Sequence, residues 1–301
     1  TLVNNADWTA GISALEFLRD VGKHITVNQM LAKDSVKSRL NSENGLSYTE
    51  FSYMLLQAND FRHLAANLDV EMQMGGSDQW GNITAGIDLI RKTLGKSAHG
   101  LTWPLVTKSD GTKFGKTAGG AVWLDASRTS PYQFRQFWVQ QADADVERYF
   151  PQFSLRPLTE CREILASHRE RPETREAQRQ LAEEMTAMVH GADAARAAAE
   201  VASILFGGDP TGASSESFAA IAAEVPSSRL TTLPVELTQL LVDTKVCASK
   251  SEARRTIEQG GVRINGAPAA VDTDPNSVPA LHGRYLLIKR GKTTYHLIDR
   301  G

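Results

Sequence analysis

The segment Met74–Gln79 combines two glycines with a carboxylate and a carboxamide, which are residue types that suit a ligand-binding turn. It follows a short apolar run from Val70 and precedes residues 83–90, whose apolar spacing is typical of a helix. A strand, a glycine turn and a helix in this order form the ligand-binding edge of a parallel α/β sheet. Asp78 and Gln79 could bond ribose hydroxyls or a carboxylate there. Taken alone, such a turn more often only connects two secondary-structure elements and binds no ligand.

A second polar group lies on one predicted helix. Ser47 and Glu50 have the spacing of a capping box, and the apolar residues that follow predict a helix to about residue 66. Tyr53, Gln57 and Asp60 interrupt its apolar surface at positions i, i+4 and i+7, so they share one stripe. Buried polar groups require hydrogen-bonding partners, and this stripe could therefore line a binding pocket. The alternative is an ordinary stripe that faces solvent.

A third group consists of lysines in a glycine-containing loop. Lys108, Lys113 and Lys116 lie within nine residues, and Asp110 is the acidic residue among them. Mobile cationic loops suit phosphate chemistry, where negative charge develops in the transition state. A solvated basic loop is the alternative. The ending Gly-Lys-Thr is not a P-loop, because Gly111 and Gly115 enclose three residues where that motif needs four.

Composition restricts the class of protein. The chain has 301 residues, of which 41% are hydrophobic and 23% charged, as in globular proteins that bury sizeable cores. Two cysteines far apart favour neither a disulfide framework nor a thiolate metal site, and we expect no protein-bound metal. We expect no membrane partner, because no apolar run approaches about 20 residues. These features favour a cytoplasmic location.

Three domains are predicted in an α/β protein. Residues 1–128 would form an α/β domain. Residues 129–227 would form an all-helical domain, and residues 228–301 a small α+β domain. Residues 234–301 carry 10 Lys and Arg against 7 Asp and Glu, whereas the remainder carries 23 against 28. The basic end suits a polyanion partner, although a solvated charged face is an equal alternative.

These motifs together resemble the bacterial-type tyrosyl-tRNA synthetase family of class I. The resemblance covers essentially the whole chain in the family's order. It implies that residues 1–128 are a partial Rossmann-like, nucleotide-binding catalytic domain with connective helices and that residues 129–227 are of the anticodon-binding type. The last domain resembles the family's S4-like RNA-binding module. It is carried by the segments 4–8, 17–24, 50–60, 75–86 and 108–117. The resemblance implies that tyrosine and ATP form tyrosyl-adenylate, which then reacts with tRNA(Tyr). It also implies a homodimer, with Mg²⁺ accompanying ATP.

The resemblance assigns a role to each group. Tyr53 and Gln57 would hold the amino group of tyrosine and Asp60 its phenolic hydroxyl, with Gln73 and Asn5 in support. The residues implied for ATP and the adenylate are Gly76, Asp78, Gln79 and Lys116. The residues implied for catalysis, by holding the departing pyrophosphate, are Lys108, Lys113, Lys116 and Thr117. The residues implied for phosphate contacts to tRNA are Lys250, Arg254, Arg255 and Arg263, for which ordinary surface charge is an equal alternative.

One departure from the family pattern is clear. The His-x-Gly-His motif that binds ATP is absent, since Lys23-His24-Ile25-Thr26 lacks its glycine and second histidine. We therefore expect that the chain lacks an amino-terminal part, which leaves open whether these residues alone are active. A non-catalytic RNA-binding protein on a degenerate scaffold is one alternative. The related tryptophan enzyme is a second alternative, against which the carboxylate of Asp60 and the basic end argue.

Overall fold

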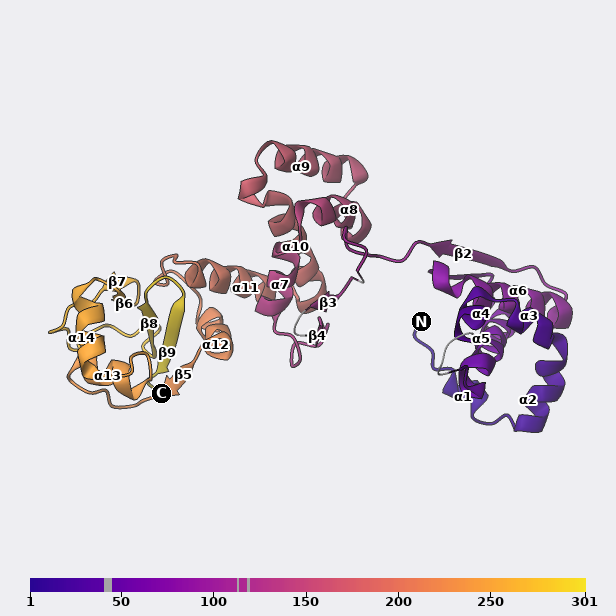
Figure 1. Cartoon of the computed structure of the whole chain (residues 1–301), viewed down its shortest axis with the longest axis horizontal. Helices are drawn as coiled ribbons and strands as arrows, with labels where there is room; N and C mark the ends of the chain where they lie inside the picture. The colour runs from indigo at the N-terminus through magenta and orange to yellow at the C-terminus, as the bar shows by residue number, and fades with distance from the viewer. Residues whose placement is uncertain (41–44, 113, 118–119) are drawn as a thin grey trace. The chain divides into compact units, whose positions relative to one another are not determined.

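The computed structural model describes residues 1–40, 45–112, 114–117 and 120–301. Contacts divide the chain into one unit of Thr1–Thr107 and a second of Lys108–Gly301. Figure 1 labels their helices and strands along the chain. The tyrosine and ribose candidates lie in the first unit, and the lysine loop and the basic end lie in the second.

Helices dominate the first unit. They are α1 (Ala6–Thr9), α2 (Ala14–Asp20), η1 (Gly22–His24), α3 (Val27–Leu31), α4 (Asp34–Leu40), α5 (Tyr48–Asn67), η2 (Ser77–Gln79) and α6 (Trp80–Leu94). The capping box predicted for α5 is confirmed, because Ser47 accepts from the Glu50 N–H and Glu50 accepts from the Ser47 N–H. The sequence predicts one helical segment over about residues 29–40, which is wrong, since α3 ends at Leu31 and α4 begins at Asp34.

The contact between α5 and α6 forms the core of this unit. Phe61 of α5 is fully buried, and Ile90 of α6 is packed in the same cluster. Gly86 of α6 faces Phe61, and a Cβ atom at this glycine would lie 2.9 Å from Phe61 Cδ1. The missing side chain therefore allows the two helices to approach closely, and this contact fixes the polar stripe of α5 relative to the start of α6.

The first unit also contains a pair of parallel strands. Strands β1 (Met72–Gly76) and β2 (His99–Trp103) pair with Met72 opposite His99 and Gly76 opposite Trp103. The apolar character of residues 103–106 predicts a buried strand there. This prediction is wrong in position and burial, because β2 ends at Trp103 and both Trp103 and Leu105 are about half exposed. The strand–turn–helix order predicted around Gly75 is confirmed by β1, η2 and α6.

The second unit begins with a short hairpin and continues as helices. The hairpin strands are β3 (Lys116–Thr117) and β4 (Gly120–Ala121), and the helices are α7 (Pro131–Val139), α8 (Asp143–Phe153), α9 (Leu158–Glu170), η3 (Pro172–Thr174), α10 (Glu176–His190), α11 (Ala192–Leu205) and α12 (Ser215–Glu224). Ser130 caps α7 by accepting from the Gln133 N–H, as its Ser-Pro start predicts.

A five-stranded sheet ends the chain in the order β5-β9-β8-β6-β7. Its elements are β5 (Ser227–Arg229), α13 (Leu237–Asp243), α14 (Lys250–Glu258), β6 (Val262–Ile264), β7 (Ala267–Pro268), β8 (Tyr285–Arg290) and β9 (Thr294–Asp299). Both faces are covered: Leu286 and Ile288 pack with α13 and α14, whereas Tyr285 and Leu287 pack with α11 and α12. In Figure 1, α13 and α14 accordingly lie on the opposite side of β8 and β9 from α12.

Two local predictions for this last part are borne out and two are corrected. The Asn265-Gly266 turn joins β6 to β7 with both residues at positive φ, as a tight hairpin requires. The hairpin around Gly291 joins β8 to β9. Residues 225–234 are predicted as a linker from their prolines and serines, but they contain β5, which pairs in parallel with β9. Ser249 and Glu252 have the spacing of a second capping box, but it is only half formed, because Glu252 accepts from the Ala248 N–H instead of the Ser249 N–H.

Candidate active site

Asn82 connects two polar groups that the sequence places on separate elements. It lies in the first turn of α6 and is 3% exposed. Its Nδ2 is 3.2 Å from the Tyr53 hydroxyl, 3.0 Å from Gln57 Oε1 and 3.2 Å from Gln79 Oε1. Gln79 in turn donates to Asp78 Oδ2 at 3.0 Å. An amide NH₂ has two hydrogens, so one of its three acceptors is left for another donor at any moment.

Lys33 is a cation within the same network. Its Nζ donates to Asn82 Oδ1 at 2.5 Å. Burial lowers the pKa of Lys33 to about 8, because the ammonium loses part of its hydration. At neutral pH the group is still mostly protonated. A poorly solvated ammonium beside amide groups favours an anionic ligand such as a phosphate.

Asp60 is held by two residues of the N-terminal segment. The Trp8 Nε1–H donates to Asp60 Oδ1 at 2.9 Å, and the Asn5 amide donates to Asp60 Oδ2 at 3.1 Å. The Trp8 ring stacks on His63, with ring centroids 4.3 Å apart. These contacts orient the carboxylate, whose oxygens keep lone pairs that can accept from a hydroxyl group. Asn5, which the resemblance implies to support the tyrosine pocket, thus contacts the carboxylate of Asp60.

Gln73 and Gly76 lie on strand β1, directly before the turn that carries Asp78 and Gln79. Gln73 Oε1 is buried and has no hydrogen-bond partner among the described residues, which is a costly arrangement that a donating ligand would relieve. A Cβ atom at Gly76 would lie 2.6 Å from Asp78 Oδ1 and 2.9 Å from Leu105 Cδ2. The turn itself therefore requires glycine at this position.

The lysine loop is anchored at its base. The Lys108 N–H donates to the Thr112 carbonyl at 2.8 Å. Asp110 accepts from both the Thr112 hydroxyl and its N–H, and these bonds hold the pKa of Asp110 below its usual value. Lys113 lies outside the described residues. Lys116 and Thr117 form β3, which pairs with β4.

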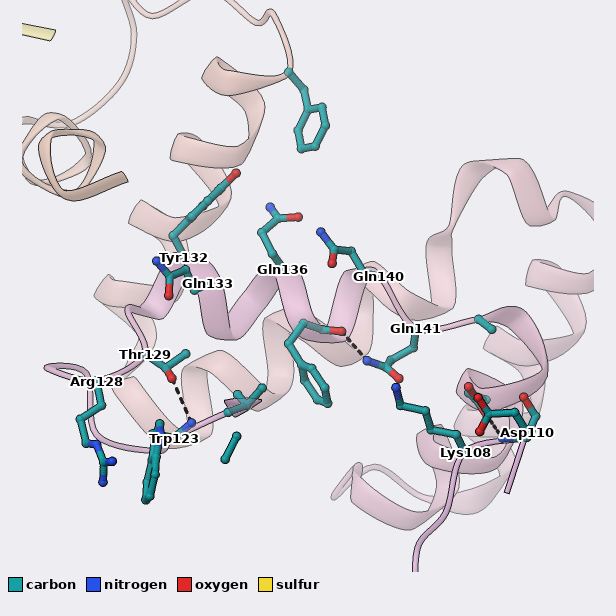
Figure 2. Close-up of a pocket in the computed structure, with 17 residues that line it drawn as sticks. Lys108, Asp110, Trp123, Arg128, Thr129, Tyr132, Gln133, Gln136, Gln140 and Gln141 are labelled. Carbon is teal, nitrogen blue, oxygen red and sulfur yellow. Dashed lines mark hydrogen bonds between the residues drawn. The ribbon is translucent and has the colours of Figure 1, made fainter. Parts of the chain in front are cut away.

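A cavity of about 1020 Å³ lies beside the base of this loop. Lys108 lines it together with Gln133, Gln136 and Gln140 of α7. Figure 2 shows the amides of Gln136 and Gln140 projecting from the same side of the helix. Gln136 is only 8% exposed, and its Nε2 has no hydrogen-bond partner in the part of the chain that the structure describes. Sequence reasoning missed this cavity, because it depends on how the loop packs against α7.

Three of the four RNA candidates lie together. Lys250, Arg254 and Arg255 of α14 line a cavity of about 420 Å³, and Lys250 donates to Glu236 at 2.9 Å. Arg263 lies on β6, donates to the Gly266 carbonyl at 2.9 Å, and lines a different cavity of about 640 Å³. The structure therefore does not bring Arg263 into the cavity of the other three.

Sequence reasoning also missed three residues of the first unit. Trp8 and Asn82 lie inside the motifs from which the resemblance was identified, but no role was assigned to them. Lys33 gave no signal, because its contact with Asn82 spans 49 positions in sequence.

Among the described residues there is no cluster of three or more His, Cys, Asp or Glu that could hold a metal ion. Nor does any helix in these ranges have the length and apolar character needed to cross a membrane.

Two family models match the chain. Residues 1–207 match tRNA synthetases class I (W and Y), and residues 217–298 match the tyrosine–tRNA ligase SYY-like C-terminal domain. The chain belongs to the tyrosyl-tRNA synthetase family. The resemblance read from the sequence and the Rossmann-like α/β fold class are therefore confirmed.

Curated relatives agree with this assignment. The chain is 50% identical over 303 residues to the tyrosine–tRNA ligase of Roseiflexus castenholzii. This alignment covers 99% of the chain and 72% of that protein. It is 48% identical over 305 residues to the tyrosine–tRNA ligase of Streptomyces griseus, which covers 100% of the chain and 72% of that protein. The chain thus spans about seven tenths of these relatives.

A solved structure is also similar. The C-terminally truncated mitochondrial tyrosyl-tRNA synthetase of Coccidioides posadasii matches with a TM-score of 0.57 and 37% identity, over 65% of this chain and 56% of that one. The function is therefore that of a tyrosine–tRNA ligase, an aminoacyl-tRNA synthetase that uses ATP as a substrate. The alternative of a non-catalytic RNA-binding protein is not favoured.

Proposed function

We propose that the first unit binds tyrosine along the polar stripe of α5 and the nucleotide at the turn that precedes α6. The observation that carries this proposal is the hydrogen-bonded network of Asn82, which links Tyr53 and Gln57 to Gln79 and through it to Asp78. Tyr53 and Gln57 would receive the amino group of tyrosine. Asp78 and Gln79, with the backbone at Gly76, would receive the ribose.

Asp60 would accept the phenolic hydroxyl of tyrosine, with Asn5 orienting its carboxylate and Gln73 supporting the pocket. The Asn5 amide and the Trp8 indole fix the carboxylate, so little reorganisation is needed when tyrosine binds. Phenylalanine lacks the hydroxyl and would leave the carboxylate with an unmade hydrogen bond. Such an unpaired group disfavours the wrong substrate strongly.

The activation step needs no protein nucleophile. A carboxylate oxygen of tyrosine attacks the α-phosphorus of ATP, the bond to the β-phosphate oxygen breaks, and pyrophosphate leaves. The side chains would act by orientation and by charge, with Lys108, Lys113 and Lys116 stabilising the departing phosphates and Thr117 completing the loop. Lys33 would add a poorly solvated cation in the first unit. Mg²⁺ would arrive with ATP, as is usual for an ion held mainly by substrate phosphates.

The second step transfers tyrosine from the adenylate to a ribose hydroxyl of tRNA, with release of AMP. We propose that Lys250, Arg254, Arg255 and Arg263 contact tRNA phosphates. The division into residues 1–128, 129–227 and 228–301 is proposed as the organisation that serves these steps. A homodimer and a cytoplasmic location complete the proposal.

The pocket assignment is tested by Asp60→Ala in the protein at its complete natural length. Tyrosine-dependent pyrophosphate exchange should be abolished, or discrimination against phenylalanine should be lost. Asn67→Ala, in the last turn of the same helix, is the matched control and should change neither. Normal exchange together with normal selectivity in the Asp60 variant would rule out the assignment.

A further inference from the structure

The side chain of Phe114 leaves the lysine loop and enters a group of rings on two helices. We name Phe137 and Trp138 of α7 with Tyr149 and Phe153 of α8 the aromatic cluster. The centroid of the Phe114 ring lies 5.5 Å from Phe137, 5.6 Å from Trp138, 4.9 Å from Tyr149 and 5.1 Å from Phe153. These are the edge-to-face and stacked distances at which aromatic pairs attract.

The aromatic cluster is a rigid receptor for this ring. Tyr149 is fully buried, and Phe137 and Trp138 are 8% and 5% exposed. The cluster rings also contact one another, with centroids 5.4 Å apart for Phe137 and Trp138 and 5.1 Å apart for Trp138 and Phe153. The position of the Phe114 ring is therefore set by helices that belong to the bundle.

The backbone on either side of Phe114 has little intrinsic stiffness. Gly111 and Gly115 have φ values of +82° and +78°, in the region that favours glycine. A hydrogen bond also fixes the start of the loop to α8. The Ser109 N–H donates to Asp145 Oδ1 of this helix at 2.6 Å, and Asp145 is 5% exposed. The loop is thus held at its base by a hydrogen bond and at its middle by one ring.

We propose that Phe114 is a positioning residue for the activation step. Its ring, docked in the aromatic cluster, holds the loop against α7 and α8 and so fixes the backbone of β3, which carries Lys116 two residues further on. This inference rests on the proposed role of the loop lysines in holding pyrophosphate. The physical reason is entropic, since a glycine-flanked loop without the anchor samples many arrangements, and few of them place a cation at the transition state.

Phe114→Ala tests the anchor in the protein at its complete natural length. The kcat of tyrosine-dependent pyrophosphate exchange should fall about 10- to 100-fold, because catalytic positioning is lost. The KM for tyrosine should stay within about twofold of the parent value, because the residues proposed to bind the substrate tyrosine belong to the first unit. Phe114→Met and Phe114→Leu keep a large apolar side chain and should recover most of the rate. A changed KM for tyrosine with normal kcat would overturn the proposal.

A second variant tests the same idea from the helix side. Phe153→Ala removes one of the two cluster rings on α8 and should lower kcat in the same way. The double variant with Phe114→Ala should be no slower than Phe114→Ala alone, because both changes remove the same contact. Phe134→Leu is the matched control: Phe134 is a buried α7 ring that contacts Trp138 and His190, and its kcat should be unchanged. Fully additive losses, or an equal loss in the control, would overturn the proposal.

Lys116→Ala separates failure of this inference from failure of the proposed loop function. A slow Lys116 variant with a slow Phe114 variant supports both ideas. A slow Lys116 variant with a normal Phe114 variant leaves the loop function intact and overturns the anchor. A normal rate in the Lys116 variant overturns the pyrophosphate role and the anchor with it. Thermal melting of each variant shows whether the helices still fold.

Discussion

Lys33 carries a partly buried ammonium group in the candidate pocket. It donates to Asn82, and its burial lowers its pKa to about 8. In the folded chain the lysine therefore loses its proton at a lower pH than in the unfolded chain, where its ordinary pKa is 10.5. Between these two values the folded state binds fewer protons, so this residue makes the free energy of unfolding rise with pH in that window.

Ligand binding should show the opposite dependence on pH. An anionic ligand such as ATP attracts the protonated lysine, so its affinity should fall as pH rises through about 8. Titration of ATP by calorimetry from pH 7 to pH 9 measures this decrease. Lys33→Met should bind ATP more weakly at pH 7 and should lose the dependence. An unchanged pH profile in this variant would show that Lys33 does not face the phosphates.

Much of the pocket could be predicted at the scale of single residues. Tyr53, Gln57 and Asp78 were identified from helical spacing and turn composition, because those patterns are local. The partners that hold them were not, since Asn82 and Lys33 meet only when α3, α5 and α6 are packed. Asp60 was predicted to face a ligand, and the two donors that orient it come from more than 50 positions away.

At the scale of elements, the packing of α5 on α6 determines the geometry of the pocket. Gly86 is the point of closest approach, because a Cβ atom there would lie 2.9 Å from Phe61 Cδ1 and 3.1 Å from Phe61 Cβ. Alanine would improve helix propensity by about 1 kcal/mol, whereas overpacking costs about 1–3 kcal/mol. Overpacking should therefore prevail at this fully buried contact.

Gly86→Ala should lower the free energy of unfolding by up to about 2 kcal/mol and weaken tyrosine binding. Urea denaturation and a tyrosine titration measure the two effects. Thr84→Ala on the same helix is the control and should not destabilise the protein. Phe61→Leu, combined with Gly86→Ala, should recover part of the loss by making room. A Gly86 variant as stable as the parent would show that the helices can move apart freely.

Element boundaries illustrate where sequence reasoning stops. Helix α3 begins after a capping box at Thr26 and ends at Leu31, where the apolar pattern gave no signal of a break before α4. The residues at 227–229 looked like a linker because they are polar and follow a proline, yet they pair with β9. Long-range strand pairing of this kind cannot be derived from local composition.

At the scale of the whole molecule, the charge is divided along the chain. Residues 234–301 carry more basic than acidic side chains, and the rest carries more acidic ones. Within the basic part, Arg254 and Arg255 extend from α14 into one cavity, whereas Arg263 lines another. If RNA follows α14, the first two arginines should act together and Arg263 independently of them.

The salt dependence of RNA binding measures these contributions. Each phosphate contact adds about 0.7–0.9 to the slope of log K against log salt concentration. The double variant Arg254→Gln, Arg255→Gln should therefore lower the slope for tRNA(Tyr) by about 1.4–1.8, and Arg263→Gln should lower it by a separate increment of about 0.7–0.9. Lys96→Gln, an exposed cation of the first unit, is the control. A slope that the double variant leaves unchanged would assign α14 to an ordinary solvated face, and it would move the search for RNA contacts to other cations of the second unit.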